Sequence, residues 1–417
     1  MKKIKITGGR ELTGTIKISG AKNSAVALIP ASLLSDGIVT IDNVPNITDI
    51  ASLTQILEYL GAKVNFKDEK MTIDHSSLIN IEIPENKSKK LRASYYFMGA
   101  LLGKYKKVEM YFPGGCSIGS RPIDQHLKGF ELLGAKVKEI GNKYIIEAKK
   151  LIGNNIYLDM PSVGATINIM LAAVKAEGKT IIGNAAKEPE IVNVATFLNN
   201  MGAKITGAGT SEIKIIGVNK LSGGFTEVIP DRIEAGTYTI AGALVGKNLK
   251  ITNIIPEHID ALTSKLREMG VYLKIANDYL VVSRTNKMNP INIKTLGYPG
   301  FPTDLQQPLT SLLVYCDGTS TLEETIYENR FQNIPYLNQM GADIMINKQT
   351  IFIKGPSKLR GSKVIATDLR AGACLVLAGL RANGVTKISD VEHILRGYDN
   401  IIEKLKNVGA DIELVDE

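Results

Sequence analysis

One pattern recurs six times along the 417 residues of the chain and constrains its fold more than any other feature. An amphipathic helical stretch is followed by Gly-Ala or Gly-Val and then by an alternating strand pattern, at intervals of roughly 70 residues. The glycines of this pattern are Gly61, Gly134, Gly202, Gly270, Gly341 and Gly409. We expect each of them to end a helix in the left-handed backbone conformation, which glycine adopts without Cβ strain. The chain is therefore predicted to consist of six related α/β units.

A second set of glycines alternates with the first. Helical stretches are predicted to end at Gly37, Gly103, Gly178, Gly246, Gly318 and Gly384, each ahead of a β-branched strand. Each unit thus contains two helices and several short strands. Three units amount to about 210 residues, more than most single cores hold, so we predict two domains of three units each. Residues 223–226, near the midpoint, are the predicted hinge, and the strand before Lys22 is expected to close the other domain.

The composition is that of a globular protein and argues against several kinds of partner. With 15 Tyr, 9 Phe and no Trp, the chain has few rings on which single-stranded nucleic acid could stack. The N-terminus lacks a signal-peptide pattern, and the longest apolar run near it, residues 25–34, is about half a membrane span. Three widely spaced cysteines fit neither a disulfide framework nor a zinc site. We therefore expect a cytoplasmic monomer with small-molecule substrates, no metal, and no nucleic acid or membrane partner.

The net charge of +8 is spread along the chain without a cluster of basic residues, but several cations occupy unusual positions. Lys22, Arg92, Arg232 and Arg370 lie where the first helices of units one, two, four and six are predicted to begin. A cation at a helix N-terminus opposes the helix dipole, so its repetition indicates an anionic ligand at these helix starts; solvated surface charge is the alternative. Polar residues at the same starts are predicted to be N-caps, namely Asn23, Ser162, Thr303 and Asp368.

A glycine-rich loop sets one cysteine apart from the other two. Cys116 lies between Gly114-Gly115 and Gly119, close to Arg121, and is expected to be reactive. Cys316 and Cys374 lie in apolar stretches and are expected to be buried and structural. His126 could pair with Cys116 as in a thiol hydrolase, although a positioning or structural role fits its spacing better. No phosphate loop, dinucleotide fingerprint or metal-ligand spacing is present, so we expect no cofactor.

Several motifs in order resemble those of the enolpyruvyl transferase family, and the resemblance covers nearly the whole chain. The motifs are Gly20-Ala21-Lys22-Asn23-Ser24, the Cys116 loop, Pro161-Ser162-Val163-Gly164, Pro230-Asp231-Arg232, Pro302-Thr303-Asp304, Glu328-Asn329-Arg330 and Asp368-Leu369-Arg370. The resemblance implies a two-domain inside-out α/β barrel with the active site in the inter-domain cleft. Each domain would contain three βαβαββ units around parallel helices. Residues 22–229 would form the domain of the Cys116 loop, and residues 1–21 and 230–417 the domain of Asp304.

The resemblance also implies a reaction. Enolpyruvate would pass by addition and elimination from phosphoenolpyruvate to the 3-hydroxyl of UDP-N-acetylglucosamine, with release of phosphate, as the first committed step of peptidoglycan biosynthesis. Two alternatives are an enzyme that uses shikimate 3-phosphate as acceptor, which lacks the cysteine loop, and a catalytically silent paralogue that binds UDP-sugars.

Roles for individual residues follow from the matched motifs alone. Asp304 would be the base that takes the proton of the sugar hydroxyl, and Cys116 the acid that protonates C3 of the donor. Phosphoenolpyruvate would be held by Lys22, Asn23, Arg121, Arg330, Arg370 and Arg396, with Lys22 and Arg396 also assisting catalysis. UDP-N-acetylglucosamine would be held by Asn23, Arg92, Arg121, Pro122, Ile123, Asp124, Gln125, Ser162, Val163, Gly164, Asp304 and Ile326. Supporting roles are implied for Asp231, Glu328 and Asp368. Met160 replaces a lysine found in some members, which puts a nucleotide contact there in doubt.

Overall fold

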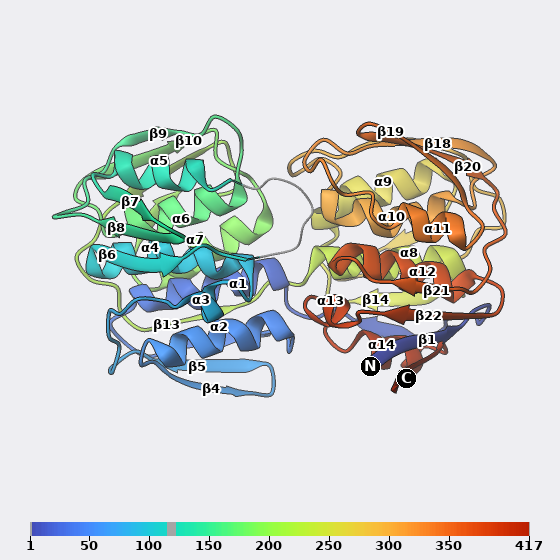
Figure 1. Cartoon of the computed structure of the whole chain (residues 1–417), viewed down its shortest axis with the longest axis horizontal. Helices are drawn as coiled ribbons and strands as arrows, with labels where there is room; N and C mark the ends of the chain where they lie inside the picture. Colours follow the sequence, from blue (N-terminus) through green and yellow to red (C-terminus); the bar gives the residue numbers. More distant parts are fainter. Residues whose placement is uncertain (1, 115–121, 417) are drawn as a thin grey trace. The chain divides into compact units, whose positions relative to one another are not determined.

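The computed structural model describes residues 2–114 and 122–416, which form two compact units (Figure 1). The Lys22 unit comprises the described residues of the range 20–229. The Asp304 unit comprises residues 2–19 together with residues 230–416. Each unit has one hydrophobic core of its own.

Three helices occupy the centre of each unit, and sheets surround them (Figure 1). Nearly every side chain of these helices is buried, as expected for helices enclosed by sheets. The central helices of the Lys22 unit are α1 (Lys22–Ala31), α4 (Tyr96–Tyr105) and α6 (Val163–Ala173). Those of the Asp304 unit are α8 (Arg232–Val245), α10 (Gln306–Leu313) and α12 (Leu369–Arg381).

The third repeat shows the plan of all six. Strand β9 (Asn155–Tyr157) leads into α6, and β10 (Lys179–Gly183) leads into the outer helix α7 (Pro189–Asn200). The hairpin β11 (Lys204–Thr206) and β12 (Glu212–Ile216) completes the repeat. The sheet order is β11-β12-β10-β9, in which only β9 and β10 run parallel. This is a βαβαββ unit, and the predicted fold class of two repeated α/β domains is confirmed.

The other sheets follow the same plan, except that the sheet of the second repeat has three strands, and a single parallel bridge between Ile83 and Met110 takes the place of its fourth. In the Lys22 unit they are β13 (Gly224–Glu227), β3 (Val39–Asp42), β5 (Lys70–Asp74) and β4 (Lys63–Lys67), and β6 (Lys107–Tyr111), β8 (Lys143–Glu147) and β7 (Lys136–Ile140). In the Asp304 unit the first two are β15 (Tyr272–Ile275), β16 (Tyr279–Ser283), β14 (Leu249–Thr252) and β2 (Thr15–Lys17), and β17 (Asn292–Lys294), β18 (Gly318–Glu323), β20 (Thr350–Gly355) and β19 (Asp343–Asn347). The last is β21 (Lys363–Ile365), β22 (Val385–Ser389), β1 (Lys2–Thr7) and β23 (Asp411–Asp416).

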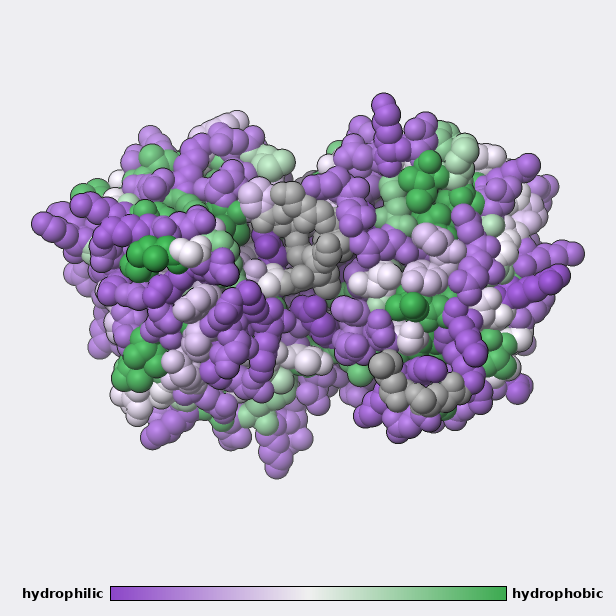
Figure 2. Space-filling view, viewed as in Figure 1, coloured by the Kyte–Doolittle hydropathy of each residue, from purple (hydrophilic) through white to green (hydrophobic). Residues whose placement is uncertain are grey.

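The remaining helices lie outside the central ones or lead into them. The outer helices are α2 (Thr48–Tyr59), α3 (Glu85–Ser88), α5 (Asp124–Leu132), α9 (Asp260–Glu268), α11 (Ile334–Gln339), α13 (Glu392–Leu395) and α14 (Ile401–Asn407). Single 3₁₀ turns are η1 (Ser32–Leu34), η2 (Arg92–Tyr95), η3 (Pro256–Ile259) and η4 (Thr303–Leu305). In the described part of the chain, no helix is long and apolar enough to cross a membrane. Figure 2 shows hydrophilic residues over most of the face in view, with hydrophobic residues in small separate areas.

The two ends of the repeat array are completed by strands distant in sequence. The N-terminal segment supplies two strands to the Asp304 unit: β2 runs parallel to β14, and β1 lies between β22 and β23. The expected closure of the other domain by this segment is confirmed, with one strand more than predicted. The predicted hinge at 223–226 is wrong, because β13 there runs parallel to β3 inside the Lys22 unit. Its glycines serve close packing instead, since a Cβ on Gly223 would lie 2.5 Å from the oxygen of Ile38.

The six glycines of the first set all have positive φ, between +87° and +107°, as predicted. Of the second set, Gly178, Gly318 and Gly384 also have positive φ. Gly103 is a correction, because it lies inside α4, which continues to Tyr105. A Cβ at Gly103 would lie 2.7 Å from the oxygen of Leu171, so this glycine permits α4 and α6 to approach closely rather than ending a helix.

The repeat glycines give a direct stability test. Gly202 has φ +107° and no atom within 4 Å of a built Cβ, so Gly202→Ala introduces backbone strain without a clash. We expect the unfolding free energy of the Lys22 unit to fall by about 1–2 kcal/mol in urea titrations. Gly297→Ala is the matched control, because Gly297 has equally open space without a positive φ. Equal unfolding midpoints for the two variants would contradict the proposed role of the repeat glycine.

Candidate functional site

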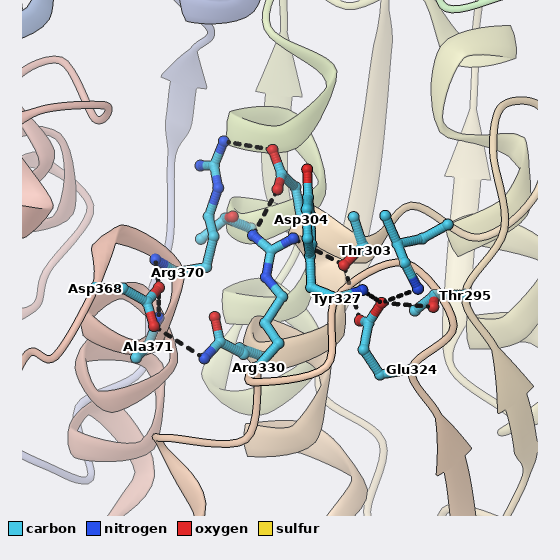
Figure 3. A network of polar contacts seen from close by, with 12 residues as sticks. Thr295, Thr303, Asp304, Glu324, Tyr327, Arg330, Asp368, Arg370 and Ala371 are labelled. Atoms are coloured by element: carbon cyan, nitrogen blue, oxygen red, sulfur yellow. Dashed lines mark hydrogen bonds and ion pairs between the residues drawn. The ribbon is translucent and has the colours of Figure 1, made fainter. Parts of the chain in front are cut away.

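The strongest polar cluster of the Asp304 unit joins one carboxylate to two arginines (Figure 3). Arg330 donates through Nη2 to Oδ1 of Asp304 at 2.6 Å, and Arg370 donates through Nη2 to Oδ2 at 3.1 Å. The arginine side chains are 3% and 4% exposed, whereas Asp304 is 25% exposed. The sequence placed these residues in one site, and the structure brings them into contact. Two buried guanidinium groups thus converge on a single, more accessible carboxylate.

The charge of these arginines is held firmly. Burial alone disfavours the charged form of Arg370, but attraction from Tyr398 and Asp304 outweighs it and raises the pKa. The pKa of Arg330 is raised in the same way, since Asp304 and Tyr327 outweigh its burial. Both side chains therefore remain cations, and an anion held between them is stabilised in a region of low dielectric.

Glu324, which the sequence analysis missed, orders the loop that carries Arg330 (Figure 3). This fully buried carboxylate accepts hydrogen bonds from the hydroxyls of Thr295 and Thr303 at 3.0 and 2.8 Å. It also accepts from the backbone N–H groups of Ile326 and Tyr327. Arg330 in turn donates through Nη1 to the hydroxyl of Thr303 at 2.7 Å. A carboxylate directly after a strand with period-two burial was the only sequence signal for it.

Helix starts position the rest of this cluster, and they correct part of the N-cap prediction. Asp368 caps α12 by accepting from the backbone N–H groups of Arg370 and Ala371, and Ser162 caps α6, as predicted. Asn23 and Thr303 are not N-caps, because α1 begins one residue before Asn23 and Thr303 lies within η4. The Thr303 hydroxyl serves Glu324 and Arg330 instead. Asp231, predicted only to support the site, is the N-cap of α8.

A buried network attaches Ser19, the last residue of the N-terminal segment of the Asp304 unit, to the start of α8. Glu234 accepts from the backbone N–H of Ser19 at 3.0 Å and from Nζ of Lys404 at 2.5 Å. Lys404 also donates to the hydroxyl of Ser19, which donates to Asp399. Burial raises the pKa of Glu234 to about 7, since desolvation outweighs the attraction of Lys404. The half-buried Arg396 lies in the same segment, two residues before Tyr398.

Glu234 should make stability fall as pH rises. Its pKa is about 7 in the folded protein and about 4.5 when unfolded, so the folded state binds more protons between these values. We expect the unfolding free energy to decrease from pH 4.5 to pH 7 by at most roughly 3 kcal/mol. Glu234→Gln removes this titration and should flatten the dependence of Tm on pH in that interval. Glu257→Gln is the control at an exposed site, and an unchanged slope in Glu234→Gln would contradict the assignment.

In the Lys22 unit, the cation that begins α1 already has an anionic partner. Lys22 lies 3.1 Å from Oδ2 of Asp49 on α2, and both side chains are largely buried. Asn23 follows it, half-buried, on the first turn of α1. Lys22, Arg232 and Arg370 lie in the first turns of their helices, and Arg92 begins η2. Cations at four helix starts are therefore confirmed as structural facts.

His126 is part of the framework beneath the start of α6. Its Nδ1 accepts a hydrogen bond from Nδ2 of Asn168 at 2.9 Å. Its pKa is lowered to about 3, chiefly by burial and also by the charge of Arg92, so the ring is neutral. A Cβ built on Gly164 would lie 2.8 Å from Cε1 of this ring. His126 therefore fits the positioning role better than the thiol-hydrolase alternative.

The structure also locates the remaining predicted residues. Pro122 and Ile123 lead into α5, whose first residues are Asp124 and the buried Gln125. Oε1 of Gln125 accepts from the backbone N–H of Met160 at 3.4 Å, while the Met160 side chain is 63% exposed.

Of the remaining predicted residues, some lie on described loops and helices, and two lie outside the described residues. Ile326 is 42% exposed on the loop that Glu324 orders, and Val163 begins α6. Glu328 lies in the segment that ends at Arg330. Cys116 and Arg121 lie outside the described residues.

The other two cysteines are structural, as expected. Burial raises the pKa of Cys316 to about 11 and that of Cys374 to about 12, so neither thiol ionises near neutral pH.

Comparisons with known proteins all find carboxyvinyl (enolpyruvyl) transferases. A family model described as EPSP synthase (3-phosphoshikimate 1-carboxyvinyltransferase) matches residues 6–405. UDP-N-acetylglucosamine 1-carboxyvinyltransferase 2 of Bacillus subtilis is 55% identical over 413 residues, covering 99% of this chain and 96% of that protein. The protein of the same name in Listeria innocua is 53% identical over 410 residues, covering 98% and 97%.

Solved structures resemble this one along their full length. The enolpyruvyl transferase NikO from Streptomyces tendae has a TM-score of 0.90 at 26% identity, covering 99% of both chains. EPSP synthase from Acinetobacter baumannii has a TM-score of 0.77 at 19% identity, covering both chains completely, and this likeness concerns the fold alone.

Proposed function

This chain belongs to the enolpyruvyl transferase family, and we propose that it transfers enolpyruvate from phosphoenolpyruvate to the 3-hydroxyl of UDP-N-acetylglucosamine, releasing phosphate. Relatives above 50% identity carry the name of that activity over nearly their whole length. The family model itself is described by the alternative activity, that on shikimate 3-phosphate. Identity over the full chain favours the UDP-sugar as acceptor.

The observation that carries the proposal is the convergence of Arg330 and Arg370 on one carboxylate. Paired guanidinium groups are suited to a carboxylate, and phosphoenolpyruvate has one. In the structure Asp304 occupies that position. Binding of the donor would exchange one carboxylate for another, so the arginines keep an anionic partner while Asp304 is released. The freed carboxylate then serves as the base.

The steps of the reaction follow from this exchange. The sugar 3-oxygen attacks C2 of the donor while its proton passes to Asp304, and C3 receives a proton from the Cys116 thiol. Breaking the C2–O bond, with return of a proton from C3 to the Cys116 thiolate and transfer of the Asp304 proton to the departing phosphate, then leaves the enol ether on the sugar. Lys22, Arg121 and Arg396 hold the phosphate. The ammonium group of Lys22 is paired with Asp49 in the structure, so the phosphate would replace Asp49 there as the donor carboxylate replaces Asp304.

The acceptor residues of the proposal come mainly from the Lys22 unit. The capped start of α6 presents Ser162, Val163 and Gly164, and His126 holds it from behind. Backbone N–H groups at a helix start suit a phosphate oxygen. Arg92, over the ring of Tyr95 at 5.9 Å, adds a cation to the same region. The other acceptor contacts proposed are Asn23, Arg121, Pro122, Ile123, Asp124, Gln125, Asp304 and Ile326.

One assay tests the acceptor. Phosphate release from phosphoenolpyruvate is measured with UDP-N-acetylglucosamine and, separately, with shikimate 3-phosphate. Release with the UDP-sugar alone is expected. Release only with shikimate 3-phosphate would replace the proposal by its alternative, and release with neither would favour the silent paralogue.

Residues 22–229 are proposed as one functional domain, and residues 1–21 with 230–417 as the other. The protein is proposed to be a cytoplasmic monomer.

Cys116 is tested by exchange of its acid group. Cys116→Ala should lower kcat about 10²–10⁴-fold, because C3 loses its proton donor, while Cys116→Asp should keep most of the activity. The epoxide fosfomycin should inactivate the wild-type protein and leave Cys116→Asp unaffected. Full activity of Cys116→Ala in the phosphate-release assay would show that another group protonates C3. Cys316→Ala, at a buried structural thiol, is the control for loss of a cysteine.

A further inference from the structure

A cavity of about 330 Å³ lies in the Asp304 unit at the far ends of its three central helices. Its lining includes Val245, the last residue of α8, Arg381, the last residue of α12, and Tyr315, which follows α10. Asp304 and Arg370 lie at the opposite, N-terminal ends of these helices. Since α8 has 14 residues, the two ends are roughly 20 Å apart, and the cavity is separate from the proposed catalytic site.

The lining of the cavity is strongly cationic. Arg10, Arg284 and Lys358 follow β1, β16 and β20. Each of these is the strand of its sheet that lies between two antiparallel neighbours, so equivalent places in the three sheets contribute one cation each. Arg381 adds a fourth from the floor. The single carboxylate of the lining, Glu11, lies 3.9 Å from Nζ of Lys247, which is not part of the lining. Four cations around one small cavity repel one another, and an anion bound among them would remove that repulsion.

Two buried polar atoms of the lining lack a partner among the described residues. They are Nη1 of Arg381 and the hydroxyl of Tyr315. The guanidinium of Arg381 lies 3.8 Å from the centre of the Tyr315 ring, so the ring shields one face and leaves its edge for hydrogen bonds. Burial and the charge of Arg284 lower the pKa of Arg381, which an added anion would reverse. A buried donor without an acceptor is costly, and that cost disappears when a ligand accepts.

Stabilisation of helix C-termini could account for one cation of the cavity lining but not for all four. A cation at a helix C-terminus is favourable because it meets the last carbonyl groups. In the Lys22 unit, cations at the C-terminal ends of the central helices do bind carbonyl oxygens. Lys104 donates to the oxygen of Ser35 at 2.6 Å and lies 3.5 Å from Asp36, and Lys106 donates to the oxygen of Gly103. The Asp304 unit retains the cations at this end while Nη1 of Arg381 meets neither carbonyl nor carboxylate among the described residues.

We propose that this cavity binds a small anion with two or more negative charges, carried by phosphoryl or carboxylate groups. Arg381 and Arg284 donate charge-assisted hydrogen bonds to it, the Tyr315 hydroxyl donates a third, and Arg10 and Lys358 neutralise its outer charges. A cavity of this volume is large enough for a compact metabolite. The inference is independent of the activity proposed above.

Isothermal titration calorimetry of the full chain with pyrophosphate, and separately with citrate, tests the proposal. Arg284→Ala and Arg381→Ala should weaken binding at least tenfold, while Arg267→Ala, an exposed position on α9, should leave it unchanged. Arg370→Ala should also leave this binding unchanged, which separates the cavity from the proposed catalytic site. Arg284 is exposed, so its substitution tests the site even if Arg381→Ala does not fold. Phosphate release by Arg284→Ala should equal that of the wild type.

The outcomes divide clearly. Binding of either anion that depends on Arg284 supports the site, and the preferred anion identifies phosphoryl or carboxylate as its chemistry. Binding that survives Arg284→Ala and Arg381→Ala, or that is lost in Arg370→Ala, would overturn the proposal. So would the absence of measurable heat with both anions at millimolar concentration.

Discussion

Asp304→Asn is expected to lower kcat by about 10²–10⁴-fold, the usual contribution of a positioned general base, while phosphoenolpyruvate binds more tightly than to the wild type. The second effect is specific to this geometry. Asp304 accepts from Arg330 at 2.6 Å and from Arg370 at 3.1 Å, so in the unliganded protein it competes with the donor carboxylate. Removing its charge removes a competitor worth a charged hydrogen bond, and the dissociation constant should fall roughly ten- to a hundredfold.

The two effects are measured separately. Phosphate release gives kcat, and calorimetry with phosphoenolpyruvate gives the dissociation constant. Asp317→Asn is the matched control, because Asp317 forms an exposed ion pair with Lys287 at 3.3 Å and should change neither quantity. Weaker donor binding by Asp304→Asn would show that Asp304 helps to hold the donor rather than yielding its place, and the exchange would be wrong.

Most of the fold was predictable because it repeats. Gly61, Gly202 and the four equivalent glycines specify the same backbone conformation at the same point of each unit, and six agreeing signals outweigh local ambiguity. Glycines that act by close packing are different. Gly103 and Gly223 look like helix ends or hinges in sequence, yet they permit contact with segments distant in the chain. Tertiary proximity of that kind leaves no local pattern.

The site was predictable where a residue carries charge against local preference. Arg370 at the start of α12 conflicts with the helix dipole, and Asp368 beside it is a recognisable cap. Glu324 gave no such signal, because its partners Thr295 and Thr303 are 29 and 21 residues away. The direct contact of Asp304 with both arginines was equally hidden, since it depends on where two repeats place their helix starts.

Arg370→Ala is the second large effect, and it should appear in KM for phosphoenolpyruvate. Arg370 is 4% exposed, and loss of one partner of a buried, hydrogen-bonded charge pair costs about 2–5 kcal/mol. We therefore expect KM to rise by roughly 30-fold to several thousandfold, with binding of the UDP-sugar much less affected. Asp368 keeps its hydrogen bond to the backbone of residue 371, so α12 keeps its cap and the fold should persist.

The conservative variant separates charge from geometry. Arg370→Lys keeps a cation but loses the planar fork, so its KM should lie between those of the wild type and Arg370→Ala. Arg360→Ala, at an exposed site of the same unit, should match the wild type. If Arg370→Ala raised KM for the UDP-sugar more than for phosphoenolpyruvate, the guanidinium pair would be an acceptor site. Asp304 would then occupy the place of an anionic group of the sugar nucleotide, and binding of phosphoenolpyruvate would not release it.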